Sequence, residues 1–158
     1  MELAEWTHIF NKKANNLKHS WNLKFDENIV PDKPNPGWKQ YIRNTSARFD
    51  CSMCSREWPS NWVKVVFHMR LVHRQGGTVK VRALRQNCKN CDDAPMEDPT
   101  ITPENISILM ENLVEKIRIK CYNQNLGKKS RPFRSFDVNS PHEPDHCEAC
   151  MKGICTRN

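Results

Sequence analysis

The chain has no apolar run long enough to span a membrane, and its first residues do not resemble a secretion signal. A spanning helix needs about 18 or more consecutive apolar residues, and polar or charged residues interrupt every such stretch here. The N-terminal sequence MELAEWTHIFNKK lacks both the apolar segment of a signal peptide and the acid-poor, arginine-rich composition of a transit peptide. We therefore expect the protein in the cytoplasm or on the cytosolic face of the endomembrane system and plasma membrane.

The patterns of zinc hydrolases and zinc deaminases are also missing. The chain has no HExxH motif, and the residues around His142 and Glu143 lack the H-x-E spacing of a zinc deaminase. Sulfur-rich sites with four protein ligands leave no open position for a reacting molecule. We expect no enzyme activity.

Glycine is scarce and large apolar residues are common, which excludes a disordered chain. Only 5 of the 158 residues are glycine, 5 are tryptophan, and 37% are hydrophobic. A chain of this length buries one modest core, so two large independent domains are not expected.

Acidic residues are scarce in the middle of the chain. Residues 38–91 contain eleven lysines and arginines but only two acidic residues, and the whole chain has a formal charge of +7. Such a surplus favours an anionic partner: nucleic acid, an acidic membrane surface or an acidic protein segment.

The centre of the chain predicts an antiparallel β-hairpin. Apolar residues alternate from Trp62 to Val72, Gly76-Gly77 supplies a turn, and alternation resumes over 78–87. The outward-facing polar residues of the two strands are expected to be His68, Arg70, Lys80, Arg82 and Arg85.

A long helix is predicted over 102–121. Thr102 is a good N-cap, Pro103 suits the first turn, and the following apolar residues recur at helical spacing. We expect this apolar face, including Cys121 as a small buried residue, to pack on the hairpin. The other expected elements are a short amphipathic helix over 6–17, a strand over 21–25, a proline-rich loop over 31–37 and a last strand around Phe136 and Val138.

Two CxxC pairs flank the predicted hairpin and suggest a zinc site. Cysteines in a reducing compartment are more often metal ligands than disulfides. Each CxxC turn places two thiolates on one side of a zinc ion, and two turns complete a tetrahedron. Pairing of the strands brings the two turns together, so the predicted ligands are Cys51, Cys54, Cys88 and Cys91.

A second zinc site is predicted near the C-terminus. His142, Cys147, Cys150 and Cys155 give the spacing H-x4-C-x2-C-x4-C. In an alternative interpretation His142 caps a turn and Cys155 is a free thiol, and an exchange of CxxC pairs between the two sites also fits the sequence. We expect two structural zinc ions, whose binding stabilises the fold.

Motifs across nearly the whole chain resemble those of the receptor-transporting protein family. They are Pro36-Gly37-Trp38-Lys39-Gln40-Tyr41, Phe49 before Cys51-x-x-Cys54, Phe67-His68-Met69, Gln86-Asn87-Cys88-x-x-Cys91 and His142-x4-Cys147-Glu-Ala-Cys150. The module is similar to the three-CxxC zinc-binding domain also seen in zygote-arrest-type proteins.

The resemblance implies a chaperone-like accessory protein that helps heptahelical G protein-coupled receptors, such as odorant, taste or opioid receptors, reach the cell surface. Its implied partners are these receptors and the trafficking machinery. Some members of the family are similar to interferon-induced antiviral proteins that bind viral RNA, so RNA binding through the basic hairpin is the alternative. Many members resemble tail-anchored proteins, whereas this chain stops at Asn158. That fits a naturally short member, or a fragment of a longer chain that is attached to a membrane.

The expected fold class is α+β: a zinc-ribbon-like antiparallel hairpin or sheet with one long packing helix and a short N-terminal helix. We expect an N-terminal segment over 1–37 that packs on the core, a three-CxxC-type zinc-binding domain over 38–155 and a tail over 156–158. The candidate partner-binding or RNA-binding residues, expected at the surface, are Trp38, Tyr41, Lys64, Arg70, Lys80, Arg82 and Arg85.

Overall fold

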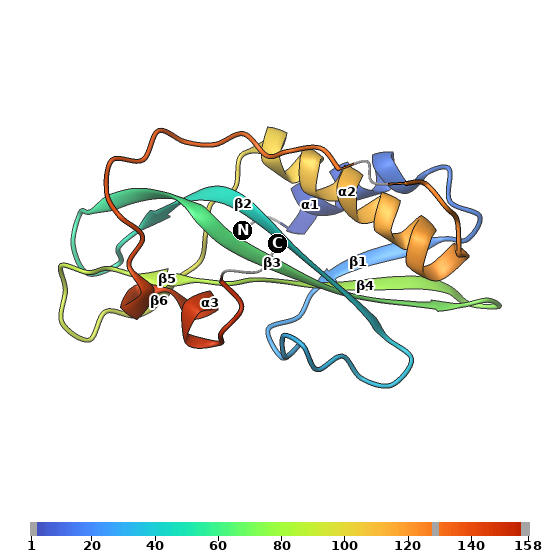
Figure 1. Ribbon diagram of the computed structural model, residues 1–158, viewed down its shortest axis with the longest axis horizontal. Helices are drawn as coiled ribbons and strands as arrows, with labels where there is room; N and C mark the ends of the chain where they lie inside the picture. The colour runs from blue at the N-terminus through green and yellow to red at the C-terminus, as the bar shows by residue number, and fades with distance from the viewer. Residues whose placement is uncertain (1–2, 128–129, 156–158) are drawn as a thin grey trace.

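A computed structural model describes residues 3–127 and 130–155 as an α+β fold around a mixed four-stranded sheet (Figure 1). The strands are β1 (Trp21–Phe25), β2 (Lys39–Asp50), β3 (Glu57–Val72) and β4 (Gly76–Ala83), in the order β1-β4-β3-β2. The antiparallel hairpin expected from the sequence is confirmed as β3 and β4. The sheet extends beyond it: β2 pairs antiparallel with β3, and β1 runs parallel to β4.

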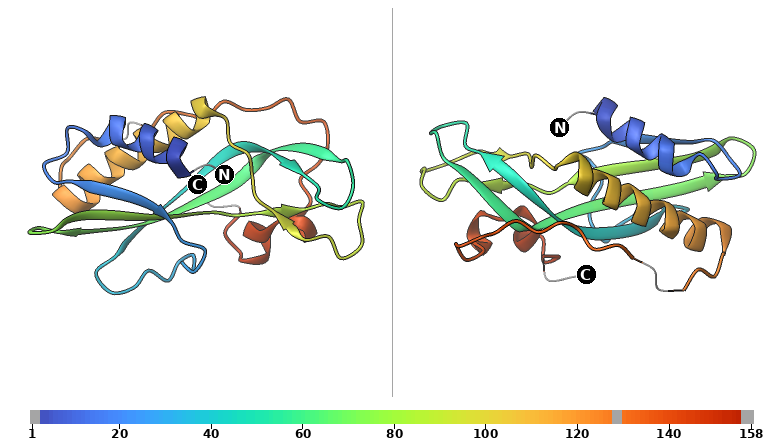
Figure 2. Two further views of the ribbon diagram at one scale, coloured as in Figure 1. Left: turned by 180° about the vertical axis from the view of Figure 1, so that it is seen from behind. Right: turned by 90° about the horizontal axis from the view of Figure 1, so that it is seen from above.

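Two helices, α1 (Leu3–Ala14) and α2 (Pro103–Tyr122), lie side by side across one face of this sheet (Figures 1 and 2). The predicted start of α2 is confirmed, because the Thr102 side chain accepts a hydrogen bond from the Asn105 N–H at 3.2 Å. Asn123 ends the helix in the left-handed conformation, with φ of 55°.

The main core lies between these helices and the sheet. Alternate residues of β3, among them Val65 and Phe67, are fully buried and share one apolar cluster with Trp6 of α1 and Leu113 of α2. Burial of each large apolar side chain contributes about 1.5–3 kcal/mol to the free energy of unfolding. The amphipathic spacing seen in the sequence is therefore core packing on both helices.

Gly77 allows β1 to lie beside β4. It is the register partner of Trp21, and a Cβ atom at this position would lie 2.2 Å from the indole ring. No residue other than glycine fits without moving the tryptophan. The sequence placed this glycine in the turn, but it lies in β4 and its role is in packing.

The opposite face of the sheet is covered by the loop between β1 and β2 and by the C-terminal elements η1 (Pro144–His146) and α3 (Glu148–Met151). A second, smaller apolar cluster lies there. Its buried members include Ile29 from the loop, Val66 from β3, Leu84 and Ile154. The sheet is thus packed on both faces.

The prediction of a strand around Phe136 and Val138 is wrong, because these residues pair with no strand among the described residues. They belong to an irregular segment, here called the return segment (residues 130–140), which runs back from the end of α2 and then down to α3 on the other side of the sheet (Figure 1). Side chains of α2 and of the β2–β3 hairpin bind its main chain, which replaces strand pairing.

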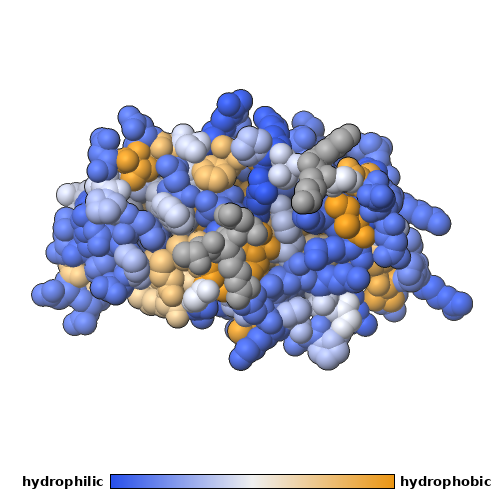
Figure 3. All heavy atoms as spheres, viewed as in Figure 1, coloured by the Kyte–Doolittle hydropathy of each residue, from blue (hydrophilic) through white to orange (hydrophobic). Residues whose placement is uncertain are grey.

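The face drawn in Figure 3 is mostly hydrophilic, with several small, separate hydrophobic patches. In the described ranges 3–127 and 130–155, no helix combines the length and apolar character needed to cross a membrane. The expected tail, 156–158, lies outside the described residues.

Candidate metal centres

The four cysteines of the first predicted zinc site lie together, and we call them cluster 1 (Cys51, Cys54, Cys88 and Cys91). All four Sγ atoms lie within 4.8 Å of one another. The Cys51–Cys91 and Cys54–Cys88 Sγ distances are 3.8 and 3.9 Å. A tetrahedron with zinc–sulfur bonds of about 2.3 Å has edges of about 3.8 Å, whereas a disulfide bond is about 2.05 Å long. The sulfur positions therefore fit a zinc tetrathiolate.

Main-chain N–H groups point at the sulfur atoms of the first CxxC turn, which follows β2. The N–H of Met53 donates to Cys51 Sγ at 3.3 Å, and the N–H of Arg56 donates to Cys54 Sγ at 3.4 Å. These hydrogen bonds stabilise the thiolate, which is the form of cysteine that binds metal. The second CxxC turn lies in the loop between the short strands β5 (Gln86–Asn87) and β6 (Met96–Glu97).

The thiols of cluster 1 do not ionise equally on their own. Burial acts to raise the pKa of Cys88, but hydrogen bonds from the Asn90 main chain and from Arg56 outweigh it and lower that pKa to about 7. A hydrogen bond with Cys54, together with burial, raises the pKa of Cys91 to about 12. Four thiolates at this spacing repel one another, and a divalent cation removes that repulsion.

The second predicted site is also assembled, and we call it cluster 2 (His142, Cys147, Cys150 and Cys155). His142 Nε2 lies 3.2 Å from Cys150 Sγ and 3.4 Å from Cys155 Sγ, close to the edge of about 3.5 Å expected for one nitrogen and one sulfur ligand on zinc. Burial lowers the pKa of His142, which favours the neutral imidazole that a metal requires. The Trp62 ring stacks on His142 at 5.4 Å and fixes its orientation.

Glu148, inside the third CxxC turn, fastens cluster 2 to the sheet. Its buried carboxylate accepts hydrogen bonds at 3.0 Å from Arg82 Nη2, Arg85 Nη2 and the Arg85 N–H. Burial acts to raise the pKa of Glu148, but the hydrogen bonds from Arg85 outweigh it and lower that pKa. Its neighbour Cys147 forms a β-bridge with Gln86, two residues before Cys88 of cluster 1. The short stretch 85–88 therefore joins the two clusters.

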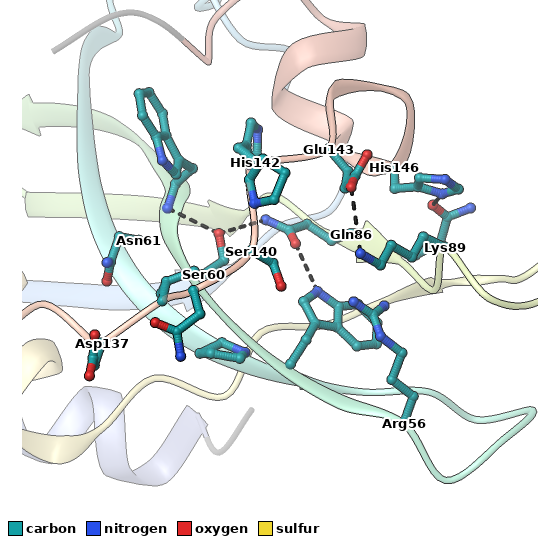
Figure 4. A pocket seen from close by; sticks show the side chains of 17 residues that line it. Arg56, Ser60, Asn61, Gln86, Lys89, Asp137, Ser140, His142, Glu143 and His146 are labelled. Carbon is teal, nitrogen blue, oxygen red and sulfur yellow. Dashed lines mark hydrogen bonds and ion pairs between the residues drawn. The ribbon is translucent and has the colours of Figure 1, made fainter.

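A pocket of about 470 Å³ lies beside cluster 2 (Figure 4). Arg56, which donates to Cys88 of cluster 1, and His142 of cluster 2 both line it. Its wall also holds Trp58, whose Nε1 donates to Gln86 Oε1 at 2.9 Å; the Gln86 amide in turn donates to Ser60 Oγ at 3.0 Å. One ligand of cluster 2 and one residue that contacts cluster 1 thus line the same pocket.

Three of the seven candidate partner-binding residues are not at the surface, contrary to expectation. Tyr41 faces the helices and stacks on Phe67, with ring centroids 5.9 Å apart. Lys64 is 2% exposed and Arg82 is 9% exposed. The alternation of the hairpin placed Lys64 and Arg82 correctly on the face opposite the helices. Elements far away in the sequence cover that face, so neither residue reaches solvent.

The other four candidates remain accessible to different degrees. Arg70 is exposed, and Trp38 and Lys80 are half-buried. Lys80 Nζ lies 4.6 Å from the centroid of the Trp38 ring and 3.6 Å from Asp26 Oδ2. Arg85 is half-buried and pairs with Glu148. The accessible basic surface is therefore smaller than the count of basic residues suggested.

His68 and Cys121 lie outside both clusters. His68 was expected to face outward, but it is buried. His68 Nε2 forms a 3.0 Å hydrogen bond with Gln40 Oε1. Cys121 packs against the main core, and burial raises its pKa. The contacts of Arg56 and Glu148 were not expected, although both are charged residues inside or just after a CxxC turn. Such a position next to a metal site is the only signal that the sequence offered.

Comparison with known proteins identifies similar chains. A zinc-ribbon family model of the 3CxxC type, described as a zinc-binding domain, matches residues 44–153. The chain is 37% identical to Receptor-transporting protein 3 of Mus musculus over 99% of its own length. It is 36% identical to Receptor-transporting protein 1 of Homo sapiens over 95%, and 35% identical to Receptor-transporting protein 2 of Mus musculus over 96%.

The family model ends at residue 153, so its match includes all of cluster 1 and three ligands of cluster 2, but not Cys155. The relatives are longer than this chain. The chain spans 34% of the first of these proteins, 59% of the second and 70% of the third. No solved structure matches the chain.

Proposed function

This chain belongs to the receptor-transporting protein family, and we propose that it is a zinc-dependent accessory protein that promotes the cell-surface expression of heptahelical G protein-coupled receptors. The observation that carries this proposal is the identity of 35–37% to receptor-transporting proteins over 95–99% of the chain. Those relatives are named for the transport of receptors. A match over nearly all of this chain suggests that the matched part of each relative contains the same folded unit.

The architecture supports a binding role. Both clusters offer four protein ligands, the arrangement of closed structural zinc sites. Zinc in such sites contributes directly to folding, so the metal would hold a recognition surface in shape. We propose zinc ions in both clusters and no catalytic step.

We propose that the contact surface includes Arg70 of β3, Lys80 of β4 and Trp38, which directly precedes β2. Lys80 and Trp38 line a second pocket of about 210 Å³ together with His68 and Asp26. An aromatic ring with a cation above it is a rigid, partly desolvated anchor, which suits a cytosolic loop of a membrane protein. The buried residues Tyr41, Lys64 and Arg82 are not part of this proposed surface.

The test is the surface abundance of a panel of heptahelical receptors in cells with and without this chain, at matched total receptor expression. We expect a reproducible rise for some receptors. A double variant that breaks both clusters, Cys54→Ser with Cys147→Ser, should lose the effect. The exposed-residue control Arg74→Ala should keep it. No change with soluble, zinc-loaded protein would contradict the proposal.

RNA binding stays a prediction with less structural support. Two of the basic residues counted in the sequence are buried, and a third, Arg85, is paired with a carboxylate. Fewer free cations mean fewer phosphates neutralised and a shallower dependence of affinity on salt. Binding of a labelled single-stranded RNA that weakens steeply with salt, and that Arg70→Ala with Lys80→Ala reduces, would favour it over receptor transport.

A further inference from the structure

Arg56 touches cluster 1 in three ways. Its carbonyl oxygen accepts a hydrogen bond from the N–H of Cys51 at 2.9 Å, and its own N–H donates to Cys54 Sγ at 3.4 Å. Its side chain reaches across to the other CxxC turn, where Nη1 lies 3.9 Å from Cys88 Sγ. One residue thus contacts both halves of the cluster.

The guanidinium of Arg56 rests on a rigid support. Its Cζ atom lies 4.5 Å from the centroid of the Trp58 ring. Trp58 is itself fixed, because it stacks on Phe49 with ring centroids 5.4 Å apart and donates its indole N–H to Gln86. A cation over an indole ring is attracted to the face of that ring, so the side chain is held where it meets the sulfur.

In the described part of the chain, Arg56 forms no ion pair with an acidic residue. None of the ion pairs among the described residues involves it. A zinc ion with four thiolates carries a net negative charge, because the thiolates outweigh one divalent cation. Cys88 is completely buried, so its charge has little help from water.

We propose that Arg56 is the positioning cation of cluster 1, which stabilises the zinc tetrathiolate by hydrogen bonding to Cys88 and by opposing its negative charge. Groups that hydrogen-bond to metal ligands commonly change metal affinity by about 10- to 100-fold when mutated. Arg56 also lines the pocket beside cluster 2. The same side chain therefore contacts cluster 1 and forms part of the pocket wall.

The test compares zinc release from the wild-type chain and from Arg56→Gln, with a chromophoric zinc chelator in excess. We expect one of the two zinc equivalents to leave about 10- to 100-fold faster in the variant, with the other unchanged. In protein reconstituted with Co²⁺, the thiolate-to-metal charge-transfer band should move to longer wavelength, because the sulfur loses a positive neighbour. A role limited to packing would not shift this band.

Two further variants keep the test decisive. Arg48→Gln is the matched control, since Arg48 also lies over an aromatic ring, that of Phe136 at 4.9 Å, but contacts no cluster. Arg56→Lys keeps the charge and should restore most of the zinc retention. Wild-type release and an unshifted band in Arg56→Gln would overturn the proposal. So would the same changes in Arg48→Gln, or an Arg56→Lys variant as labile as Arg56→Gln.

Discussion

The side-chain amide of Asn61 in β3 pairs with the main chain of Phe136 in the return segment. Asn61 Nδ2 donates to the Phe136 carbonyl oxygen at 2.9 Å, and the Phe136 N–H donates to Asn61 Oδ1 at 2.8 Å. Two other asparagines make the same double contact: Asn112 with Arg131, and Asn105 with Arg134. Three amides thus imitate a neighbouring strand along a segment that has none. These contacts hold the return segment in place where it connects α2 with cluster 2 on the other face of the sheet.

Replacing Asn61 should loosen this connection. Asn61→Ala removes two hydrogen bonds and leaves the main chain of Phe136 with fewer partners, which should lower the free energy of unfolding by about 1–3 kcal/mol. Urea unfolding of the zinc-loaded protein measures the loss, and faster proteolysis within 130–140 would localise it. Asn139→Ala, at an exposed position of the same segment, is the control and should change neither. Equal stability of the two variants would contradict the account.

Substitution of Glu148 tests how cluster 2 is attached to the sheet. Glu148→Gln leaves the buried Arg82 with only its longer 3.9 Å ion pair to Glu27, and removing one member of a buried pair typically costs about 3–5 kcal/mol. The matched control is Glu104→Gln, whose 2.9 Å pair with Arg134 is exposed to solvent and should contribute less than about 1 kcal/mol. Thermal and urea unfolding of both variants give the comparison. Similar losses in the two would mean that Glu148 is not the attachment point.

His68 predicts a pH dependence of stability. Burial, assisted by the charge of Lys80, lowers the pKa of His68 below its usual value of 6.5. The unfolded chain therefore binds a proton at a higher pH than the folded chain does. This contribution to stability is complete above the unfolded pKa and is lost as pH falls through it towards the folded pKa.

The measurement is the difference in unfolding free energy between the wild type and His68→Gln, at saturating zinc, from about pH 7.5 to 5.5. Taking the difference cancels the protonation of the metal ligands, which both proteins share. The wild type should lose stability relative to the variant as pH falls. His8→Gln, at an exposed position of α1, serves as the control. A pH-independent difference would contradict the assignment.

Local features were predictable from the sequence. The CxxC spacing and the β3–β4 alternation predicted cluster 1, because a hairpin between two CxxC turns brings them together. Cluster 2 needed only residues that are close in the sequence. The capping residue Thr102 marked the start of α2, since its side-chain bond is made within four residues.

Features that depend on distant residues were not predictable. The pairing of Arg82 with Glu148 spans 66 positions, and alternation shows which face a residue occupies but not what covers that face. The strand β2 was missed because polar residues such as Asn44 and Ser46 interrupt its apolar pattern. Ser46 donates to the Arg134 carbonyl at 2.6 Å, so a polar residue there suits the return segment.

Zinc content per chain tests the central claim most directly. Elemental analysis of the purified wild type, paired with its protein concentration, should give two zinc ions per chain, in keeping with two four-ligand clusters. Cys88→Ser and Cys147→Ser should each reduce the zinc content to one ion, and Cys121→Ser, outside both clusters, should leave two. A wild type with fewer than two ions, or a Cys121→Ser variant that loses one, would contradict the account.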